Sequence, residues 1–335
     1  MTGQGKAIAH PNIALAKYWG KLDGPGNLPS VPSLSLTLDG MATTTQVTFE
    51  PELHEDTLQL DGQSASGRPR ERVTELLDAL WLRSSTLGSV AQRPRARVES
   101  ANDFPTASGL ASSASAFAAL AVAANEAAGA GLQAADLSDL ARRISASSAR
   151  SFFGGFVELA AGQHADQQLA ARSLAPTSHW ALRLIVAVTD EGEKSVGSTE
   201  GMLRTAATSP YYAAWVEAAP SLFDAVRKAV LARDFDALVG PVEQSALAMH
   251  ATSIAAAPGI IYWNQATIAA IDRVRALRAR GTPACFTIDA GPHVKVLTPE
   301  AHEAEVAAAL QDVPGVLRTI AARPGEGARA LVAAS

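Results

Sequence analysis

Residues 105–115 read Pro-Thr-Ala-Ser-Gly-Leu-Ala-Ser-Ser-Ala-Ser, and an alanine-rich stretch follows as far as about Gly129. Small side chains let the backbone approach a phosphate closely, and serine hydroxyls add hydrogen-bond donors. The helix that the alanine-rich stretch predicts would point its unpaired N–H groups and the positive end of its dipole at the same anion. A closely packed helix start that binds nothing would show the same pattern. The segment is not a Walker loop, because no GxxxxGK[ST] occurs in the sequence.

The segments around this helix predict both strands and helices. Residues 5–16 and 33–50 predict strands, because SLSLTL and TTTQVTFE alternate and are rich in β-branched residues. They are separated by a loop marked by Gly24, Pro25, Gly26, Pro29 and Pro32. Further predicted elements are a helix at 70–85, a strand near 94–100, a helix at about 135–147 and a short strand after Gly154-Gly155.

The apolar run Leu-Ile-Val-Ala-Val at 184–188 predicts a buried strand that begins a second lobe. The other elements predicted there are helices near 211–231, 234–254 and 264–280, strands at 284–289 and 293–298, and a helix at 299–311. One face of the helix at 264–280 is expected to be buried, because apolar residues recur at near-helical spacing at Ile268, Ile271, Val274 and Leu277. Because strands and helices alternate without strict βαβ repetition, we predict an α+β fold in two lobes, 1–182 and 183–335.

Composition excludes several classes of protein. The 335 residues are 47% hydrophobic and 18% charged, which is enough apolar material for a sizeable core. A net charge of −5 argues against nucleic acid as a partner, so an anionic ligand would need a local cluster of cations. Cys285 is the only cysteine, and the seven histidines show no HExxH or paired spacing. No run approaches the ~20 apolar residues of a membrane span, so we expect no membrane partner and a cytoplasmic location.

Three further segments hold candidate functional residues, and each also has a structural interpretation. In Asn12–Lys21 an apolar run ends in Lys17 and Lys21, which flank two aromatic residues and are either solvated or line a charged pocket. In the segment 145–155, Arg150 either ends a helix or binds a carboxylate or phosphate through its planar fork. In the segment 286–293, Asp289 ends an apolar strand before Gly-Pro and is either a turn former or a functional carboxylate.

Taken in order along the chain, these blocks resemble the diphosphomevalonate decarboxylase family. This family belongs to the wider galactokinase, homoserine kinase, mevalonate kinase and phosphomevalonate kinase group. The resemblance covers residue 10 to about 297 and rests on HPNIALAKYWGK, PTASGLASSASAFAALA, SARSFFGGFVE, GSTEGM, LAMHAT and FTIDAGPHVKVL. The NIALAKYWGK and DAGP blocks are specific to the decarboxylases, whereas the Gly-Leu-Ala-Ser-Ser loop is shared across the group. The resemblance implies the two-lobed small-molecule-kinase fold, with an N-terminal phosphate-binding helix loop.

The resemblance also implies roles for individual residues. Asp289 matches the catalytic aspartate, and Lys17 matches a lysine near the reacting hydroxyl and the γ-phosphate. The residues matched to substrate binding are Asn12, Tyr18, Lys21, Ser147 and Arg150, of which the arginine pairs with the substrate carboxylate. Those matched to the ATP phosphates are Asn102, Ser108, Gly109, Ser112, Ser113 and Lys194. Mg²⁺ is expected through the ATP phosphates, and Ser113 is the candidate for a protein contact.

The implied reaction is the ATP-dependent decarboxylation of diphosphomevalonate to isopentenyl diphosphate, by an expected homodimer. The chain departs from the family pattern at Val31-Pro32, before Ser33, and at Thr199, where some bacterial relatives carry an arginine. These departures leave open a sibling enzyme that decarboxylates mevalonate monophosphate or stops at 3-phosphorylation. A non-catalytic metabolite sensor would be expected to lose Asp289 or Lys17, and neither is lost. An alanine-rich interaction module would explain the composition but not the set of motifs.

Overall fold

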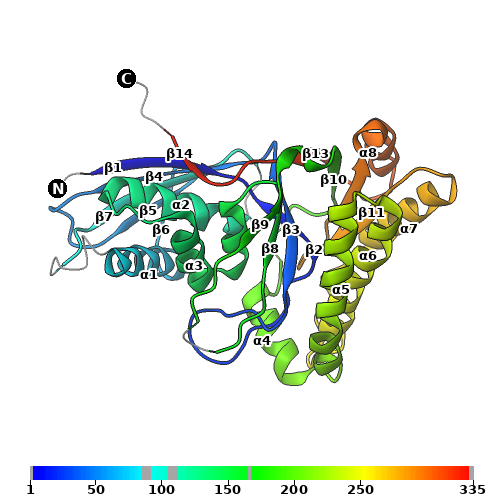
Figure 1. The fold of residues 1–335 in the computed structure, drawn as a ribbon, viewed down its shortest axis with the longest axis horizontal. Helices are drawn as coiled ribbons and strands as arrows, with labels where there is room; N and C mark the ends of the chain where they lie inside the picture. Colours follow the sequence, from blue (N-terminus) through cyan, green and yellow to red (C-terminus); the bar gives the residue numbers. More distant parts are fainter. Residues whose placement is uncertain (1–2, 85–91, 105–111, 165–166, 193, 332–335) are drawn as a thin grey trace.

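The computed structural model describes residues 3–84, 92–104, 112–164, 167–192 and 194–331. A six-stranded sheet in the order β14-β1-β4-β7-β5-β6 forms one end of the molecule. Helices α1 and α2 pack on one of its faces, and α3 packs against both helices (Figure 1). The strands and helices of this part are β1 (Gln4–Ala9), β4 (Thr43–Phe49), β5 (Thr57–Leu60), β6 (Gln63–Ala65), β7 (Ala96–Asn102), β14 (Arg329–Ala330), α1 (Arg68–Arg83), α2 (Ser112–Ala128) and α3 (Ala134–Ile144).

An eight-stranded sheet forms the centre, in the order β11-β12-β10-β13-β3-β8-β9, with β2 pairing β3 off this path. Strand β13, near the end of the chain, lies between β10 and β3 and so joins elements from both halves of the sequence. The strands are β2 (Asn12–Ala16), β3 (Ser33–Asp39), β8 (Phe156–Leu159), β9 (Arg172–Ala175), β10 (Leu182–Val188), β11 (Cys285–Ile288), β12 (Val294–Pro299) and β13 (Arg318–Pro324).

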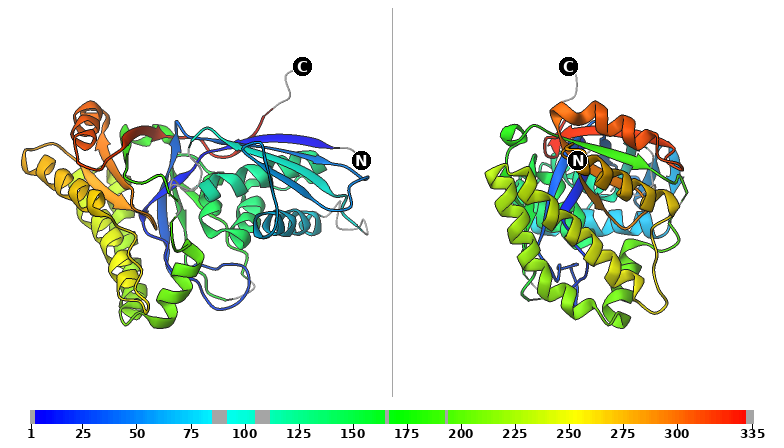
Figure 2. Two further views of the ribbon diagram at one scale, coloured as in Figure 1. Left: turned by 180° about the vertical axis from the view of Figure 1, so that it is seen from behind. Right: turned by 90° about the vertical axis from the view of Figure 1, so that its right-hand side faces the viewer.

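Helices cover the far end of this sheet on both faces, as the views from behind and from the end show (Figure 2). Strand β10 alternates between them: Leu184 and Val186 join the core beneath α5 and α6, whereas Ile185 and Ala187 join the core beneath α7 and α8. The helices here are α4 (Ser198–Thr208), α5 (Tyr212–Ala232), α6 (Phe235–Ile254), α7 (Gln265–Ala279) and α8 (Glu303–Gln311). Short 3₁₀ helices lie at Ala146–Phe152, Thr177–His179 and Glu300–His302.

The expected α+β class is confirmed, and several boundaries are finer than predicted. The strand predicted at 5–16 is divided at His10-Pro11, and the one at 33–50 turns at Gly40, whose φ is +93°. Helix α3 ends at Ile144, and the 3₁₀ helix that follows carries the serines and arginine of the predicted 145–155 segment. The loop that precedes α2 lies outside the described residues.

The prediction that Ile268 belongs to a buried helix face is wrong. Ile268 is 46% exposed, whereas Ile271, Val274 and Leu277 are buried. An α-helix turns about 100° per residue, so residues spaced by three fall about 60° further round at each step. Over the three such steps from Ile268 to Leu277 this amounts to half a turn, and the two side chains lie on opposite sides of α7.

Among the described helices, none is long and apolar enough to cross a membrane.

Candidate active site

A cavity of about 550 Å³ lies where the two halves of the chain meet. Its walls come from the end of β2, the N-terminus of α2, the 3₁₀ helix at Ala146–Phe152, the start of α4 and the turn between β11 and β12. Residues predicted from distant parts of the sequence line it together, namely Asn12, Lys17, Tyr18, Lys21, Ser112, Ser113, Ser147, Arg150, Lys194 and Asp289.

Of the predicted ATP-binding residues that the structure describes, Asn102 is not among those that line the cavity. Asn102 ends β7, and its Oδ1 accepts a hydrogen bond from the Thr43 hydroxyl at 2.6 Å. Ser108 and Gly109 lie outside the described residues. The serines that follow them, Ser112 and Ser113, form the start of α2 at the cavity wall.

Lys17 and Asp289, which both line the cavity, form an ion pair. Each is the first residue after a fully buried strand, β2 and β11, and the Thr287 hydroxyl donates to Ala14 O between the two strands. Lys17 Nζ lies 2.5 Å from Asp289 Oδ1 and also donates to Ala14 O at 2.9 Å. Burial lowers the pKa of the Lys17 ammonium to about 8, against the opposing effect of the Asp289 charge.

A second lysine, Lys295 on β12, lies 3.4 Å from Asp289 Oδ2. Burial by itself would raise the pKa of the Asp289 carboxyl, but the charges and hydrogen bonds of Lys17 and Lys295 outweigh burial and hold the pKa well below its usual range. Asp289 is therefore ionised at neutral pH.

Arg150 is almost fully buried, and three polar side chains hold its guanidinium. Nη1 donates to Ser33 Oγ at 2.7 Å, and Nε donates to Ser35 Oγ at 3.1 Å and Asn12 Oδ1 at 3.2 Å. Burial lowers the pKa of Arg150 to about 10, so it still carries its charge at neutral pH. The serines of the SLS segment thus fix an arginine whose side chain faces the cavity.

Asn12 is fully engaged by the protein. Its amide nitrogen donates to Ser147 O at 3.0 Å and to Ser151 Oγ at 2.8 Å, while its oxygen accepts from Arg150. Asn12 therefore ties β2 to the 3₁₀ helix that carries Ser147 and Arg150. Ser147 is half-buried, and its hydroxyl lies 3.4 Å from that of Ser145.

Lys21 also lines the cavity, and it is held by the loop that follows it. Its Nζ donates to Asn27 Oδ1 at 2.6 Å, and Asn27 in turn donates to the Arg143 carbonyl at 2.5 Å. Burial, together with the positive charge of Arg72, lowers the pKa of Lys21 to about 8. Burial also raises the pKa of the Tyr18 phenol, which stays neutral.

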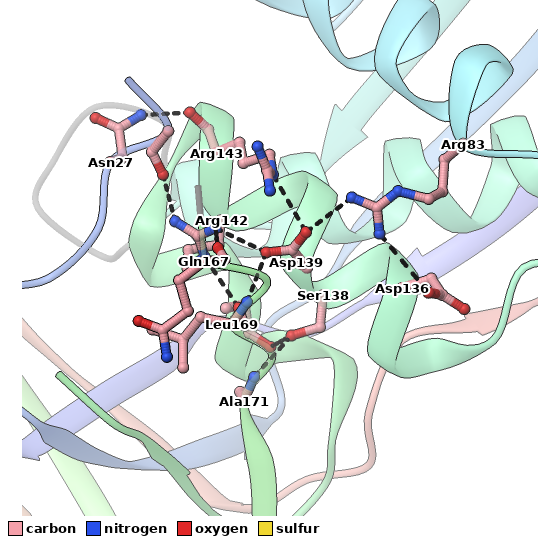
Figure 3. A network of polar contacts seen from close by, with 12 residues as sticks. Asn27, Arg83, Asp136, Ser138, Asp139, Arg142, Arg143, Gln167, Leu169 and Ala171 are labelled. Atoms are coloured by element: carbon pink, nitrogen blue, oxygen red, sulfur yellow. Dashed lines mark hydrogen bonds and ion pairs between the residues drawn. The ribbon is translucent and has the colours of Figure 1, made fainter. Parts of the chain in front are cut away.

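The loop is anchored on a buried ionic network (Figure 3). Arg142 donates to Gly26 O in the loop and to Asp139 Oδ1, the latter at 2.7 Å. Asp139 also accepts from Arg83, from Arg143 and from the backbone N–H of Leu169. The position of Lys21 therefore depends on helix α3, more than a hundred residues further along the chain.

Sequence reasoning missed two residues that line the cavity and one, Lys295, that lies beside it. Arg72, on α1, lines it and donates to Ile144 O at 2.9 Å. Ser198, the first residue of α4, accepts a hydrogen bond from Lys194 Nζ at 3.0 Å. Lys295 had a signal in the sequence, because it is a lone lysine in the apolar strand segment Val-Lys-Val-Leu.

The two departures from the family pattern, at Val31-Pro32 and at Thr199, lie at different positions relative to the cavity. Val31 is fully buried and packs with Trp19 and Met202 in an apolar cluster. Thr199 lines the cavity at the N-terminus of α4, beside Ser198. Of the two, only Thr199 is placed to affect ligand binding directly.

Comparison with known proteins agrees with this geometry. A family model described as the diphosphomevalonate decarboxylase-like N-terminal domain matches residues 9–171, and one described as the mevalonate 5-diphosphate decarboxylase C-terminal domain matches residues 184–323. A diphosphomevalonate decarboxylase of Candida albicans is 36% identical over 309 residues, which cover 88% of this chain and 84% of the relative.

Two solved structures are similar over nearly the whole chain. The mevalonate diphosphate decarboxylase of Staphylococcus aureus has a TM-score of 0.91 and 36% identity, and the match covers 99% of this chain and 98% of that one. A complex of MDDEF with MVAPP, AMPPCP and magnesium has a TM-score of 0.89 and 39% identity, covering 99% of both chains.

The two-lobed α+β fold is that of the small-molecule kinase group that includes galactokinase and mevalonate kinase. Within that group, the chain belongs to the diphosphomevalonate decarboxylase family.

Proposed function

We propose that this chain catalyses the reaction of its family, in which ATP and diphosphomevalonate give ADP, phosphate, CO₂ and isopentenyl diphosphate. The supporting observation is the charge of the cavity. Lys17, Lys21, Arg72, Arg150 and Lys194 line the described part of the cavity, and Asp289 is the only carboxylate among the lining residues. A chain of net charge −5 thus gathers cations at one place. A diphosphate, a carboxylate and a triphosphate repel one another, and such a site offsets that repulsion.

Asp289 and Lys17 have different proposed roles in the reaction. Asp289 is ionised and lies where it can orient the tertiary 3-hydroxyl toward the γ-phosphate. Because its pKa is held low, orientation and charge suit it better than lasting acceptance of a proton. After phosphorylation, the same negative charge stabilises the positive character that develops at C3 as phosphate and CO₂ leave. Lys17 supplies positive charge beside the transferring phosphoryl group.

The substrate's anionic ends would be bound by separate walls of the cavity. Arg150, held in place by Ser33 and Ser35, offers its remaining N–H groups to the carboxylate. Tyr18, Lys21 and the N-terminus of α4 suit the diphosphate, since N–H groups at a helix start and an ammonium both favour an anion.

Magnesium fits this site as a companion of the nucleotide. The described residues contain no cluster of three His, Cys, Asp or Glu side chains. The ion would therefore be held mainly by phosphate oxygens, with the hydroxyl of Ser113, at the start of α2, as the protein contact. Magnesium neutralises phosphate charge during phosphoryl transfer.

The test is a coupled assay of ADP and CO₂ release with mevalonate, mevalonate monophosphate and diphosphomevalonate. We expect the highest kcat/KM with diphosphomevalonate and equal amounts of the two products. A higher kcat/KM with the monophosphate would contradict the proposed substrate. ADP release without CO₂ would contradict decarboxylation.

Three further features are proposed for this chain. The first is a division into lobes after residue 182, which is supported by family models that match on either side of it. The others are a homodimer, to be tested by sedimentation equilibrium, and a cytoplasmic location, to be tested by cell fractionation. The single buried thiol of Cys285 is compatible with a reducing compartment.

A further inference from the structure

Lys295 is a fully buried ammonium beside the proposed catalytic aspartate. Its side chain is 0% exposed, and its Nζ lies 3.4 Å from Asp289 Oδ2. Lys17 Nζ holds the other oxygen, Oδ1, at 2.5 Å. The two lysines differ in one respect, because Lys17 lines the cavity and Lys295 is not among the described residues that do.

The strand position of Lys295 is one that favours an apolar side chain. On β12, Val294 and Val296 pack toward α7 and α8, whereas Leu297 packs in the core beneath α5 and α6. Residues two apart on a strand share a face, so Lys295 lies on the same face as Leu297. It pairs with Thr287 on β11 and Val186 on β10, inside the sheet rather than at its edge.

Stability does not account for a lysine at this place. Removing an ammonium from water is costly, and an ion pair in the interior often fails to repay that cost in full. Replacement of a buried charged group by an apolar side chain of similar volume is often neutral or stabilising. The charge at position 295 is therefore better explained by what it does to Asp289.

We propose that Lys295 is a positioning residue that holds Asp289 Oδ2 from behind the cavity, so that the carboxylate keeps one orientation toward the substrate. The inference rests on the proposed catalytic role of Asp289. It also separates the two lysines: Lys17 can turn toward the γ-phosphate during the reaction while Lys295 remains as the constant partner of Asp289.

Other charged groups around Asp289 do not replace Lys295. Lys194 lies in the cavity wall, where it contacts Ser198 Oγ and Ala290 O. Arg150 is held by Asn12, Ser33 and Ser35. Burial lowers the pKa of His250, on α6, to about 3, so its ring is neutral. Beside Lys17, Lys295 is thus the charged side chain that the structure pairs directly with Asp289.

The test is Lys295→Met, which keeps the length of the side chain and removes its charge. We expect a melting temperature equal to or above that of the wild type, and a fall in kcat of about tenfold to a hundredfold, as for groups that orient a catalytic ligand. The KM for ATP should stay within about twofold. The acid limb of the kcat/KM profile should move to higher pH, because Asp289 loses one of its two cations. Lys228→Met, at an exposed position on α5, is the control for the loss of one positive charge.

A double variant tests whether Lys295 acts through Asp289. If it does, Lys295→Met should cost nothing further in an Asp289→Asn background, because the carboxylate that it positions is already gone. Independent, multiplying losses of kcat in the double variant would overturn the proposal. A kcat of Lys295→Met within about twofold of the wild type would overturn it as well.

Lys295→Gln, which keeps a hydrogen-bond donor, is the second variant to be measured in case Lys295→Met does not fold. If both Lys295→Met and Lys295→Gln failed to fold, Lys295 would be a structural residue and the proposal would be wrong. Turnover of diphosphomevalonate by the wild type is measured first. Its absence would contradict the proposed function, whereas a loss confined to the variants concerns Lys295 alone.

Discussion

Both carboxylate oxygens of Asp289 form ion pairs with lysines. Oδ1 lies 2.5 Å from Lys17 Nζ, and Oδ2 lies 3.4 Å from Lys295 Nζ. A turn-forming aspartate would instead accept hydrogen bonds from nearby backbone N–H groups. Two ammonium groups reaching one carboxylate from separate strands cost desolvation energy that a turn does not require. The arrangement therefore favours the catalytic interpretation of this residue.

Asp289→Asn is expected to keep the fold and ATP binding but to lower kcat by at least about a hundredfold, as for the loss of one preorganised electrostatic contact to the transition state. The amide keeps the shape and loses the charge. The measurement is CO₂ release by the purified variant, with circular dichroism to establish that it is folded. Release at more than a tenth of the wild-type rate would mean that Asp289 is not catalytic.

Arg150→Lys should raise the KM for the substrate and lower kcat, although the charge is retained. The guanidinium contacts Ser33, Ser35 and Asn12 while its other N–H groups face the ligand, and one ammonium cannot reproduce that fork. Steady-state kinetics measure both constants. The interpretation of Arg150 as the carboxylate-binding residue would fail if both constants remained at wild-type values.

At the scale of elements, the start of α2 separates two serines that are close in sequence. Ser113 is exposed and faces the cavity. Ser115 is fully buried, its hydroxyl lies 2.6 Å from that of Thr43, and it donates to Ser112 O at 3.2 Å. One serine is available to a phosphate, and the other joins the helix to β4.

Ser113→Ala should therefore raise the KM for ATP with little change in the free energy of unfolding. Ser115→Ala should show the reverse, with near-normal kinetics and a loss of stability of about 1 kcal/mol from its hydrogen bond. Paired kinetic and denaturant-unfolding experiments compare the two variants. Wild-type kinetics in both would indicate that the start of α2 only packs.

At the scale of the whole molecule, the end of the chain completes the central sheet. Strand β13 pairs with β10 along five residues and then with β3 at Arg323 and Pro324, whereas β14 is a two-residue edge strand. Without β13, β10 and β3 would lose their common neighbour and leave backbone groups unpaired in the core.

A chain shortened to end at Val316 should therefore lose cooperative unfolding, because it lacks β13. A chain shortened to end at Ala328, which keeps β13 and lacks β14, is the matched control and should fold. Thermal unfolding followed by circular dichroism distinguishes the two. Cooperative unfolding of the shorter chain would show that the two halves fold without β13.

The burial of Lys17 and Lys21 in the folded protein also predicts how activity and stability respond to alkaline pH. The pKa values of Lys17 and Lys21 are both lowered to about 8, so kcat/KM should fall as pH rises through about 8. In the window between that value and the ordinary 10.5, the unfolded chain binds more protons than the folded one. The contribution of these groups to stability therefore rises with pH while activity falls. A profile flat to about pH 9.5 would contradict the two lowered pKa values.

Lys21→Arg distinguishes the contributions of Lys17 and Lys21 to the alkaline fall of kcat/KM. The guanidinium stays charged at alkaline pH, so the remaining alkaline limb would report Lys17.

The sequence by itself determined the main strands and helices, the α+β class and the residue blocks that identify the family, because hydrophobic periodicity and local motifs are recorded in neighbouring residues. It also held an unused signal: Asp61-Gly62, both with positive φ, is the turn of the β5–β6 hairpin.

Only the tertiary structure decided how distant segments meet. Strand β13 carries weak alternation because it is half-exposed, and its place between β10 and β3 depends on partners from both halves of the chain. The engagement of Asn12 by Arg150 and Ser151 and the pairing of Lys295 with Asp289 likewise involve groups that only folding brings together. Charge pairing and burial act through space, and no local pattern in the sequence records which side chains will be neighbours.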